Sequence, residues 1–182
     1  MKHIVFVMGS TCAGKSTLIE QAVKQYGPLV RTCLIGKELR ARHPPEYFRG
    51  LAAMPETEPE VREIFSNRLT EFMEDDRAGY LLCDGIPRLP TQVEFISREL
   101  DRARHAYDQR IDARFIVLHA DANEIDRRAH ERDCGANLEL TLSRIKTDKL
   151  LGYDTLISVV KEYDVSAVDT SNGTVTCAVL VG

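Results

Sequence analysis

The chain has 182 residues, of which 43% are hydrophobic and 29% charged, and its net charge is −4. This balance is typical of a soluble globular protein, and we expect a single domain over residues 1–182. The sequence has no basic stripe for binding nucleic acid and no apolar run of the roughly 20 residues that a membrane span needs. Its five cysteines include no C-x-x-C pair. We therefore expect no disulfide framework and no structural zinc, and a cytoplasmic location.

Short apolar runs separated by helical patterns predict a parallel sheet. The runs cover residues 4–8, 30–35, 80–83, 115–119 and 165–168. None has the alternating pattern of a strand with one solvated face, so helices should cover both faces of the sheet. The predicted fold class is α/β, with five parallel strands between helical layers.

Helical patterns fill the gaps between these runs, and the clearest has apolar residues with a period of 3.6 over residues 58–78. The expected helices cover residues 16–26, 36–42, 58–78, 91–103, 123–132, 138–151 and 154–163. The stretch from 174 to 181 fits either a strand or a helix.

The segment from Gly9 to Ser16 matches G-x-x-x-x-G-K-[ST] at every fixed position. It follows the first predicted strand and opens the first predicted helix. Glycine lets the backbone turn tightly there, so that N–H groups and the helix N-terminus can face an anion. Lys15 would reach phosphate oxygens and Ser16 would bind Mg²⁺. The alternative, a glycine-rich turn with a solvated lysine, does not explain this strand–loop–helix context.

A second polar motif follows the third predicted strand. Asp84 ends that strand, where a carboxylate can hold Mg²⁺ through water, and Arg88 offers a fork of donors to a phosphate. Taken alone, the pair also fits a strand-end aspartate and a surface arginine.

Residues 84–92, Asp-Gly-Ile-Pro-Arg-x-x-x-Gln, resemble the D-G-[FY]-P-R-x-x-x-Q segment of adenylate kinases. Residues 36–40, Gly-Lys-Glu-Leu-Arg, are similar to the T-G-D-x-L-R segment of that family. Arg128, Arg132 and Arg144 then follow in the order of the family's later arginines. Because these segments span nearly the whole chain, it resembles the adenylate kinase group of nucleoside monophosphate kinases.

The resemblance implies a three-layer P-loop kinase fold that moves the γ-phosphate of ATP to a nucleoside monophosphate, most simply AMP. It implies a monomer with an acceptor-binding arm at about 36–78 and a short lid at about 132–144. ATP would be held by Gly9, Ser10, Thr11, Cys12, Ala13, Gly14, Lys15, Ser16, Thr17 and Arg128. The acceptor would be held by Gly36, Arg40, Gly85, Arg88, Gln92 and Arg144. Lys15, Arg88, Arg128, Arg132 and Arg144 would carry catalysis, and Ser16 and Asp84 would hold Mg²⁺ partly through water.

Several positions depart from the family pattern or have a second interpretation. Ile35 replaces a threonine that meets the acceptor base and Lys37 replaces an aspartate, which leaves the acceptor base open. Arg128 and Arg132 also fit a solvated helix face paired with Glu124 and Glu131. The helix dipole and Lys15 can lower the pKa of Cys12, but a small residue that fits a tight loop is the favoured interpretation of this cysteine.

Two other functions remain open. A kinase for a small-molecule hydroxyl would need a carboxylate base and would have less use for both Arg40 and Arg88. A non-catalytic nucleotide-binding module would be expected to lack Lys15, Asp84 or a lid arginine, and all are present. No N-K-x-D segment points to a guanine-specific switch.

Overall fold

The computed structural model describes residues 1–44, 47, 58–133, 136–150, 160, 163–173 and 175–181. Five strands form one sheet in the order β2-β3-β1-β4-β5, and every neighbouring pair is parallel. The strands are β1 (Lys2–Met8), β2 (Val30–Leu34), β3 (Tyr80–Asp84), β4 (Ile111–His119) and β5 (Asp164–Asp169). The predicted five-stranded parallel sheet is therefore confirmed. Ile35, predicted to end the second strand, instead begins a helix.

The described helices match the predicted ones in order and differ mainly at their ends. They are α1 (Lys15–Tyr26), α2 (Ile35–Arg42), α3 (Glu58–Glu74), α4 (Pro90–Tyr107), α5 (Ala122–Arg132), α6 (Ala136–Leu150) and α8 (Ala178–Val181), with a short 3₁₀ helix at Gly27–Leu29. The stretch after residue 174 thus contains a helical turn. Of the helix predicted over 154–163, all but Val160 and Tyr163 lies outside the described residues.

The largest differences are at the C-terminal ends of α3 and α4. The helix predicted to reach Ala78 ends at Glu74, because the chain turns and Ala78 N–H donates to the Asp75 carbonyl. The helix predicted to end at residue 103 continues to Tyr107, where Asp108 adopts a left-handed conformation (φ 46°) and stops it.

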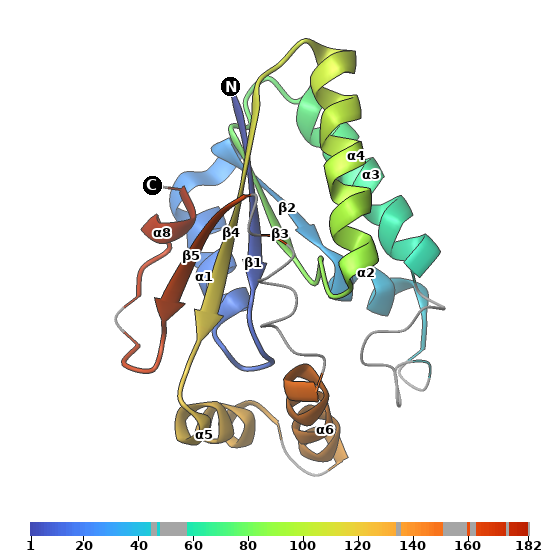
Figure 1. The fold of residues 1–182 in the computed structure, drawn as a ribbon. Helices are drawn as coiled ribbons and strands as arrows, with labels where there is room; N and C mark the ends of the chain where they lie inside the picture. The colour runs from blue at the N-terminus through green and yellow to red at the C-terminus, as the bar shows by residue number, and fades with distance from the viewer. Residues whose placement is uncertain are drawn as a thin grey trace.

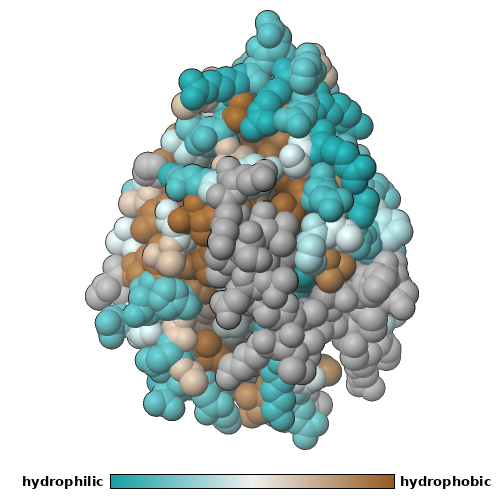
Figure 2. Space-filling model, in the orientation of Figure 1, coloured by the Kyte–Doolittle hydropathy of each residue, from teal (hydrophilic) through white to brown (hydrophobic). Residues whose placement is uncertain are grey.

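The sheet lies between two helical layers, with α3 and α4 on one face and α1 and α8 on the other (Figure 1). Alternate residues of β1 enter the two cores: Ile4 and Phe6 face α3 and α4, whereas Val5 and Val7 face α1. This two-sided burial explains why the strand is continuously apolar in sequence. Hydrophilic residues cover most of the visible surface of α4, on the side away from the sheet (Figure 2).

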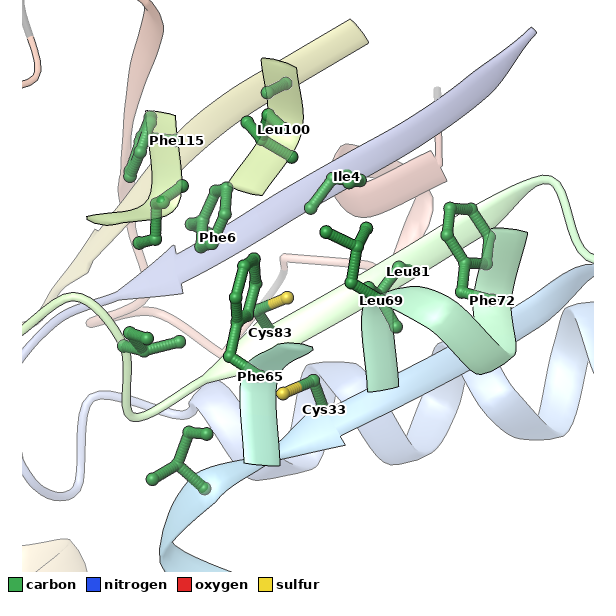
Figure 3. Packing of buried hydrophobic residues seen from close by; sticks show 14 of the residues in the cluster. Ile4, Phe6, Cys33, Phe65, Leu69, Phe72, Leu81, Cys83, Leu100 and Phe115 are labelled. Carbon is green, nitrogen blue, oxygen red and sulfur yellow. The ribbon is translucent and has the colours of Figure 1, made fainter. Parts of the chain in front are cut away.

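Phe6, Phe65, Phe72 and Phe115 lie among aliphatic side chains in the core under α3 and α4 (Figure 3). Phe6 stacks on Phe115 with ring centroids 4.7 Å apart and lies 6.0 Å from the ring of Phe65. Cys33 and Cys83 are register partners on β2 and β3, and both are fully buried. The core therefore joins β1, β2, β3 and β4 to the helices on this face.

The carboxyl ends of the strands point toward α5 and α6 (Figure 1). In a parallel sheet, the loops that follow all the strands emerge at this one edge. The segments after β1, β3 and β5 therefore meet there, although they are far apart in sequence. In the part of the chain that the structure describes, no helix is long and apolar enough to cross a membrane.

Candidate functional site

The loop between β1 and α1 requires glycine at its first turn. Gly9 has φ 134°, and a Cβ atom at this position would lie 2.3 Å from the Leu118 carbonyl oxygen of β4. Cys12 and Gly14 also have positive φ values, of 67° and 92°. This backbone turns sharply from the end of β1 into the N-terminus of α1, which is the geometry that a phosphate-binding loop needs.

The loop and the first turn of α1 open onto a cavity of about 710 Å³ at the carboxyl edge of the sheet. Most of the residues predicted for the site line this one cavity. They are Thr11, Cys12, Gly14, Lys15, Ser16, Thr17, Gly36, Arg40, Asp84, Gly85, Arg88, Gln92, Arg128, Arg132 and Arg144. The remaining predicted residues, Gly9, Ser10 and Ala13, form the inner side of the loop, where Gly9 and Ala13 are buried.

Lys15 lies against its own loop. Its ammonium group donates to the carbonyls of Gly9 (2.7 Å) and Ser10 (2.9 Å). An ammonium group has three donors, so this arrangement leaves one for an anion in the cavity. Burial and the nearby charge of Arg88 lower the pKa of Lys15, against the opposing effect of Asp84 and Asp148. A bound anion would therefore stabilise the charged form of Lys15.

Arginines from separate elements form a second group of cations. Burial lowers the pKa of Arg40, and the charges of Arg144, Arg132 and Arg88 lower it further. These guanidinium groups, which come from α2, α6, α5 and the segment after β3, are therefore close enough to repel one another. Such a cluster is relieved when an anion enters it.

Arg132 is fixed between α5 and α6. It donates to Asp133 (2.7 Å) and to the hydroxyl of Thr141 (2.9 Å), and that hydroxyl in turn donates to Asp133. A solvated helix face would pair Arg132 with Glu131. In the structure Glu131 pairs with Arg127 instead.

Arg128 links α5 to two loops at the edge of the sheet. It pairs with Glu124 (2.7 Å), as a solvated helix face would, but it also donates to the carbonyls of Cys12 (3.3 Å) and Thr170 (2.5 Å). The Thr170 hydroxyl lies 3.0 Å from the Ala13 carbonyl, so the loop after β5 contacts the glycine-rich loop directly.

The part of the cavity beside α2 combines polar and apolar lining. Gly85 has φ 91°, and a Cβ atom there would lie 3.2 Å from the Ile35 Cβ atom. Gln92 is buried, and its amide oxygen accepts from the Arg88 backbone N–H at 2.6 Å, which sets the orientation of the amide. Ile35 and Leu39 add apolar surface. This part of the cavity can hold a flat ring against aliphatic side chains with one amide at its edge.

Asp148 is the functional residue that sequence reasoning missed most clearly. One of its carboxylate oxygens accepts from both the backbone N–H (2.7 Å) and the hydroxyl (2.8 Å) of Thr11. The other lies 3.8 Å from an Arg88 guanidinium nitrogen, and the residue is buried. An aspartate among polar residues of an amphipathic helix gives no sequence signal for such a contact.

Other lining residues were also not predicted as site residues. They are Leu18, Gln21, Ile35, Leu39, Leu89, Glu131, Thr170, Gly173 and Val175. For Thr170 and Gly173 the available signal was their place just after the last parallel strand, where ligands commonly bind.

The oxygen donors needed by Mg²⁺ are present in the cavity. The hydroxyl of Ser16 and the carboxylate of Asp84 both line it, close to the loop and Lys15. Mg²⁺ is typically held by one or two protein oxygens together with substrate phosphates and water, so this donor set fits the ion.

A lowering of the Cys12 pKa by the helix dipole and Lys15 is not what the structure shows. Burial raises the pKa of this thiol, and it outweighs the opposing charges of Arg132, Lys15 and Arg128. Cys12 therefore serves the loop as a small side chain in a left-handed conformation rather than as a reactive thiolate.

Comparison with protein-family models and with curated proteins found no match for this chain. The geometry alone can bind two anionic groups: one at the loop with Lys15, and one among the arginines beside α2. Both groups of residues line a single cavity.

Proposed function

We propose that this protein transfers the terminal phosphoryl group of ATP to a nucleoside monophosphate, with AMP as the leading acceptor. The observation that carries the proposal is the convergence of Lys15, Arg40, Arg88, Arg132 and Arg144, from five separate segments, on one cavity. A single phosphate group does not require so many cations. Two nucleotides that meet through their phosphates do, because their mutual repulsion must be offset.

The donor would lie over the glycine-rich loop. Its phosphates would accept hydrogen bonds from the backbone N–H groups at the start of α1 and from Lys15. Arg128 and the loop that contains Thr170 and Gly173 border this end of the cavity and would face the donor base. Mg²⁺, held by Ser16 and Asp84 together with the donor phosphates, would supply further positive charge.

The acceptor would lie between α2 and the segment after β3. Arg40 and Arg88 would bind its phosphate, and the Gln92 amide would meet the edge of its base against Ile35 and Leu39. In this arrangement the acceptor oxygen approaches the donor's terminal phosphate in the region of Arg88.

Phosphoryl transfer leaves little covalent work for the protein, so alignment and charge stabilisation account for most of the rate. A monophosphate acceptor attacks through an oxygen that is already ionised at neutral pH and needs no general base. The guanidinium groups stabilise the charge that spreads over the transferred group, and closure around the cavity keeps water from competing as acceptor.

One observation favours a second candidate function. A kinase that phosphorylates a small-molecule hydroxyl needs a carboxylate to accept the hydroxyl proton, and Asp148 supplies a carboxylate beside Arg88 in the cavity. The two hydrogen bonds that Asp148 accepts from Thr11 make it less available as a base. We therefore favour the proposal with a monophosphate acceptor.

A coupled assay for ADP release, with MgATP and a panel of purine and pyrimidine monophosphates, tests the proposal. We expect turnover with at least one monophosphate, and the fastest with AMP. Turnover only with hydroxyl compounds that lack phosphate would favour the second candidate. Tight ATP binding without turnover of any acceptor would indicate a non-catalytic nucleotide-binding module.

A further inference from the structure

We propose that the Asp148 carboxylate occupies the place of the donor's terminal phosphate and must be displaced when a nucleoside triphosphate binds. This inference rests on the proposed function, because it concerns the same phosphate site. Asp148 would act as an internal anion that closes the empty site and as a residue that controls which polyphosphates the site accepts.

The contacts of Asp148 are those that a phosphate would make. Its carboxylate accepts from a backbone N–H and a hydroxyl of the glycine-rich loop, at 2.7 and 2.8 Å, and faces the Arg88 guanidinium at 3.8 Å. Its charge also acts on Lys15. Backbone amides, hydroxyls, guanidinium and ammonium groups are the donors that bind phosphate oxygens most strongly.

The position of Thr11 indicates which phosphate is replaced. The N–H groups at the start of α1, from Gly14 onward, bind the inner phosphates of a nucleotide in loops of this kind. Thr11 precedes Gly14 by three residues. The Asp148 carboxylate lies between Thr11 and the Arg88 guanidinium and contacts both. Because Arg88 borders the acceptor end, the phosphate nearest to the acceptor belongs at this place.

The carboxylate and the terminal phosphate cannot share these donors. Both are anions that would need the Thr11 N–H, and repulsion between them is strong in a site with little water. A triphosphate must therefore push Asp148, and with it this part of α6, away from the loop. A diphosphate bound at the start of α1 does not reach Thr11 and leaves the contact in place.

The test compares tripolyphosphate with pyrophosphate, since neither carries a base. Calorimetric titration of Asp148→Asn, which removes the charge but keeps the size, should show tripolyphosphate bound about 10-fold more tightly than by the wild type. Pyrophosphate affinity should change by less than about twofold. Asp148→Ser, which is too short to reach Thr11, should give the same selective gain and provides a second variant if one folds poorly.

Glu131→Gln is the matched control, because it removes one negative charge from the cavity lining without removing a contact to Thr11. It should change the two affinities equally and by less than about threefold. An equal gain for both probes in Asp148→Asn, a gain in Glu131→Gln as large as in Asp148→Asn, or weaker tripolyphosphate binding in the Asp148 variants would overturn the proposal. The last result would make Asp148 a positioning residue of the loop.

The wild type provides an independent measurement. Tripolyphosphate should bind to the wild type less than about threefold more tightly than pyrophosphate does, because the cost of displacing Asp148 offsets the contacts of the third phosphate. A 100-fold difference would contradict this. Selective tightening in a protein without turnover in the monophosphate panel would support the role of Asp148 and refute the proposed reaction. Turnover without selective tightening would support the proposed reaction and refute the role of Asp148.

Discussion

Arg88 connects the two ends of the cavity through its backbone and its side chain. Its backbone N–H holds the Gln92 amide at 2.6 Å, and its guanidinium faces Asp148 across 3.8 Å. Its charge also contributes to the lowered pKa values of Lys15 and Arg40. Arg88 therefore acts on both Lys15 and Arg40, so the effect of removing it should be large.

We predict that Arg88→Ala lowers kcat for MgATP and AMP by about 10²-fold or more, which corresponds to a loss of about 2.7 kcal/mol of transition-state stabilisation. The physical reason is that the guanidinium would stabilise charge on the transferred group. Steady-state kinetics measures the effect. Arg98→Ala, which removes an exposed arginine of α4, is the control and should leave kcat unchanged within about twofold. A near-normal rate for Arg88→Ala would remove Arg88 from the catalytic group.

At this scale the sequence predicted residues that belong to a recognisable motif and missed Asp148, whose contacts depend on where α6 lies in the fold. Gly9 was predictable because a strand–loop–helix segment with this spacing requires a residue without Cβ at its first turn. Asp148 was not predictable, since its partner Thr11 is 137 residues away and its own neighbours form an ordinary polar helix face.

Lys2 stabilises the end of a helix that is distant in sequence. Its ammonium group donates to the carbonyls of Phe72 (3.1 Å), Asp75 (2.7 Å) and Ala78 (2.8 Å), just where α3 ends and the chain turns toward β3. All three donors of the group are used, and the side chain is 6% exposed. The carbonyls of Phe72 and Asp75 also accept from the backbone N–H groups of Asp75 and Ala78, so Lys2 adds a charged donor to the turn where α3 ends.

We predict that Lys2→Met lowers the free energy of unfolding by about 3 kcal/mol, because methionine fills the space but removes three hydrogen bonds from a charged donor. For a protein of this size the midpoint of thermal unfolding should fall by roughly 6–12 °C. Thermal unfolding followed by circular dichroism measures the change. Lys24→Met, at an exposed lysine of α1, is the control and should shift the midpoint by no more than about 2 °C. Equal effects of the two substitutions would show that the contacts of Lys2 contribute little.

The Lys2 contacts also show why the ends of elements were harder to predict than their existence. The apolar residues of α3, from Val61 to Met73, have a clear helical period, and the helix was predicted from them. Its end depends instead on the Asp75 turn and on a lysine 70 residues or more away in the chain, neither of which follows from periodicity. β1 was likewise predicted from its apolar residues, and the prediction began at Ile4 rather than at the buried Lys2.

At the level of the whole molecule, a parallel sheet brings the site together. Because all five strands are parallel, each loop after a strand emerges at the same edge, so the glycine-rich loop after β1, Gly85 after β3 and Thr170 after β5 line one cavity. The sequence predicted this convergence because five short, two-sided apolar runs allow few other arrangements. It did not predict the contact of α6 with the loop, which depends on how a helix at the edge of the sheet is oriented.

A site that holds two nucleotides should bind a ligand that carries both of them far better than either alone. We predict that a dinucleotide with two adenosines joined by five phosphates stabilises the protein more than ATP and AMP do separately. A linked ligand loses its translational freedom only once, and its phosphates meet Lys15 and the arginines together. At about 1,000 times its dissociation constant it adds about 4 kcal/mol to the free energy of unfolding, or roughly 8–16 °C to the midpoint. Thermal unfolding with each ligand at equal concentration measures this. Arg88→Ala leaves the glycine-rich loop intact but removes a cation between the two nucleotides. In this variant the dinucleotide should raise the midpoint little more than ATP does, whereas the effect of ATP should remain. A dinucleotide shift no larger than that of ATP would mean that the acceptor end of the cavity does not bind a nucleotide.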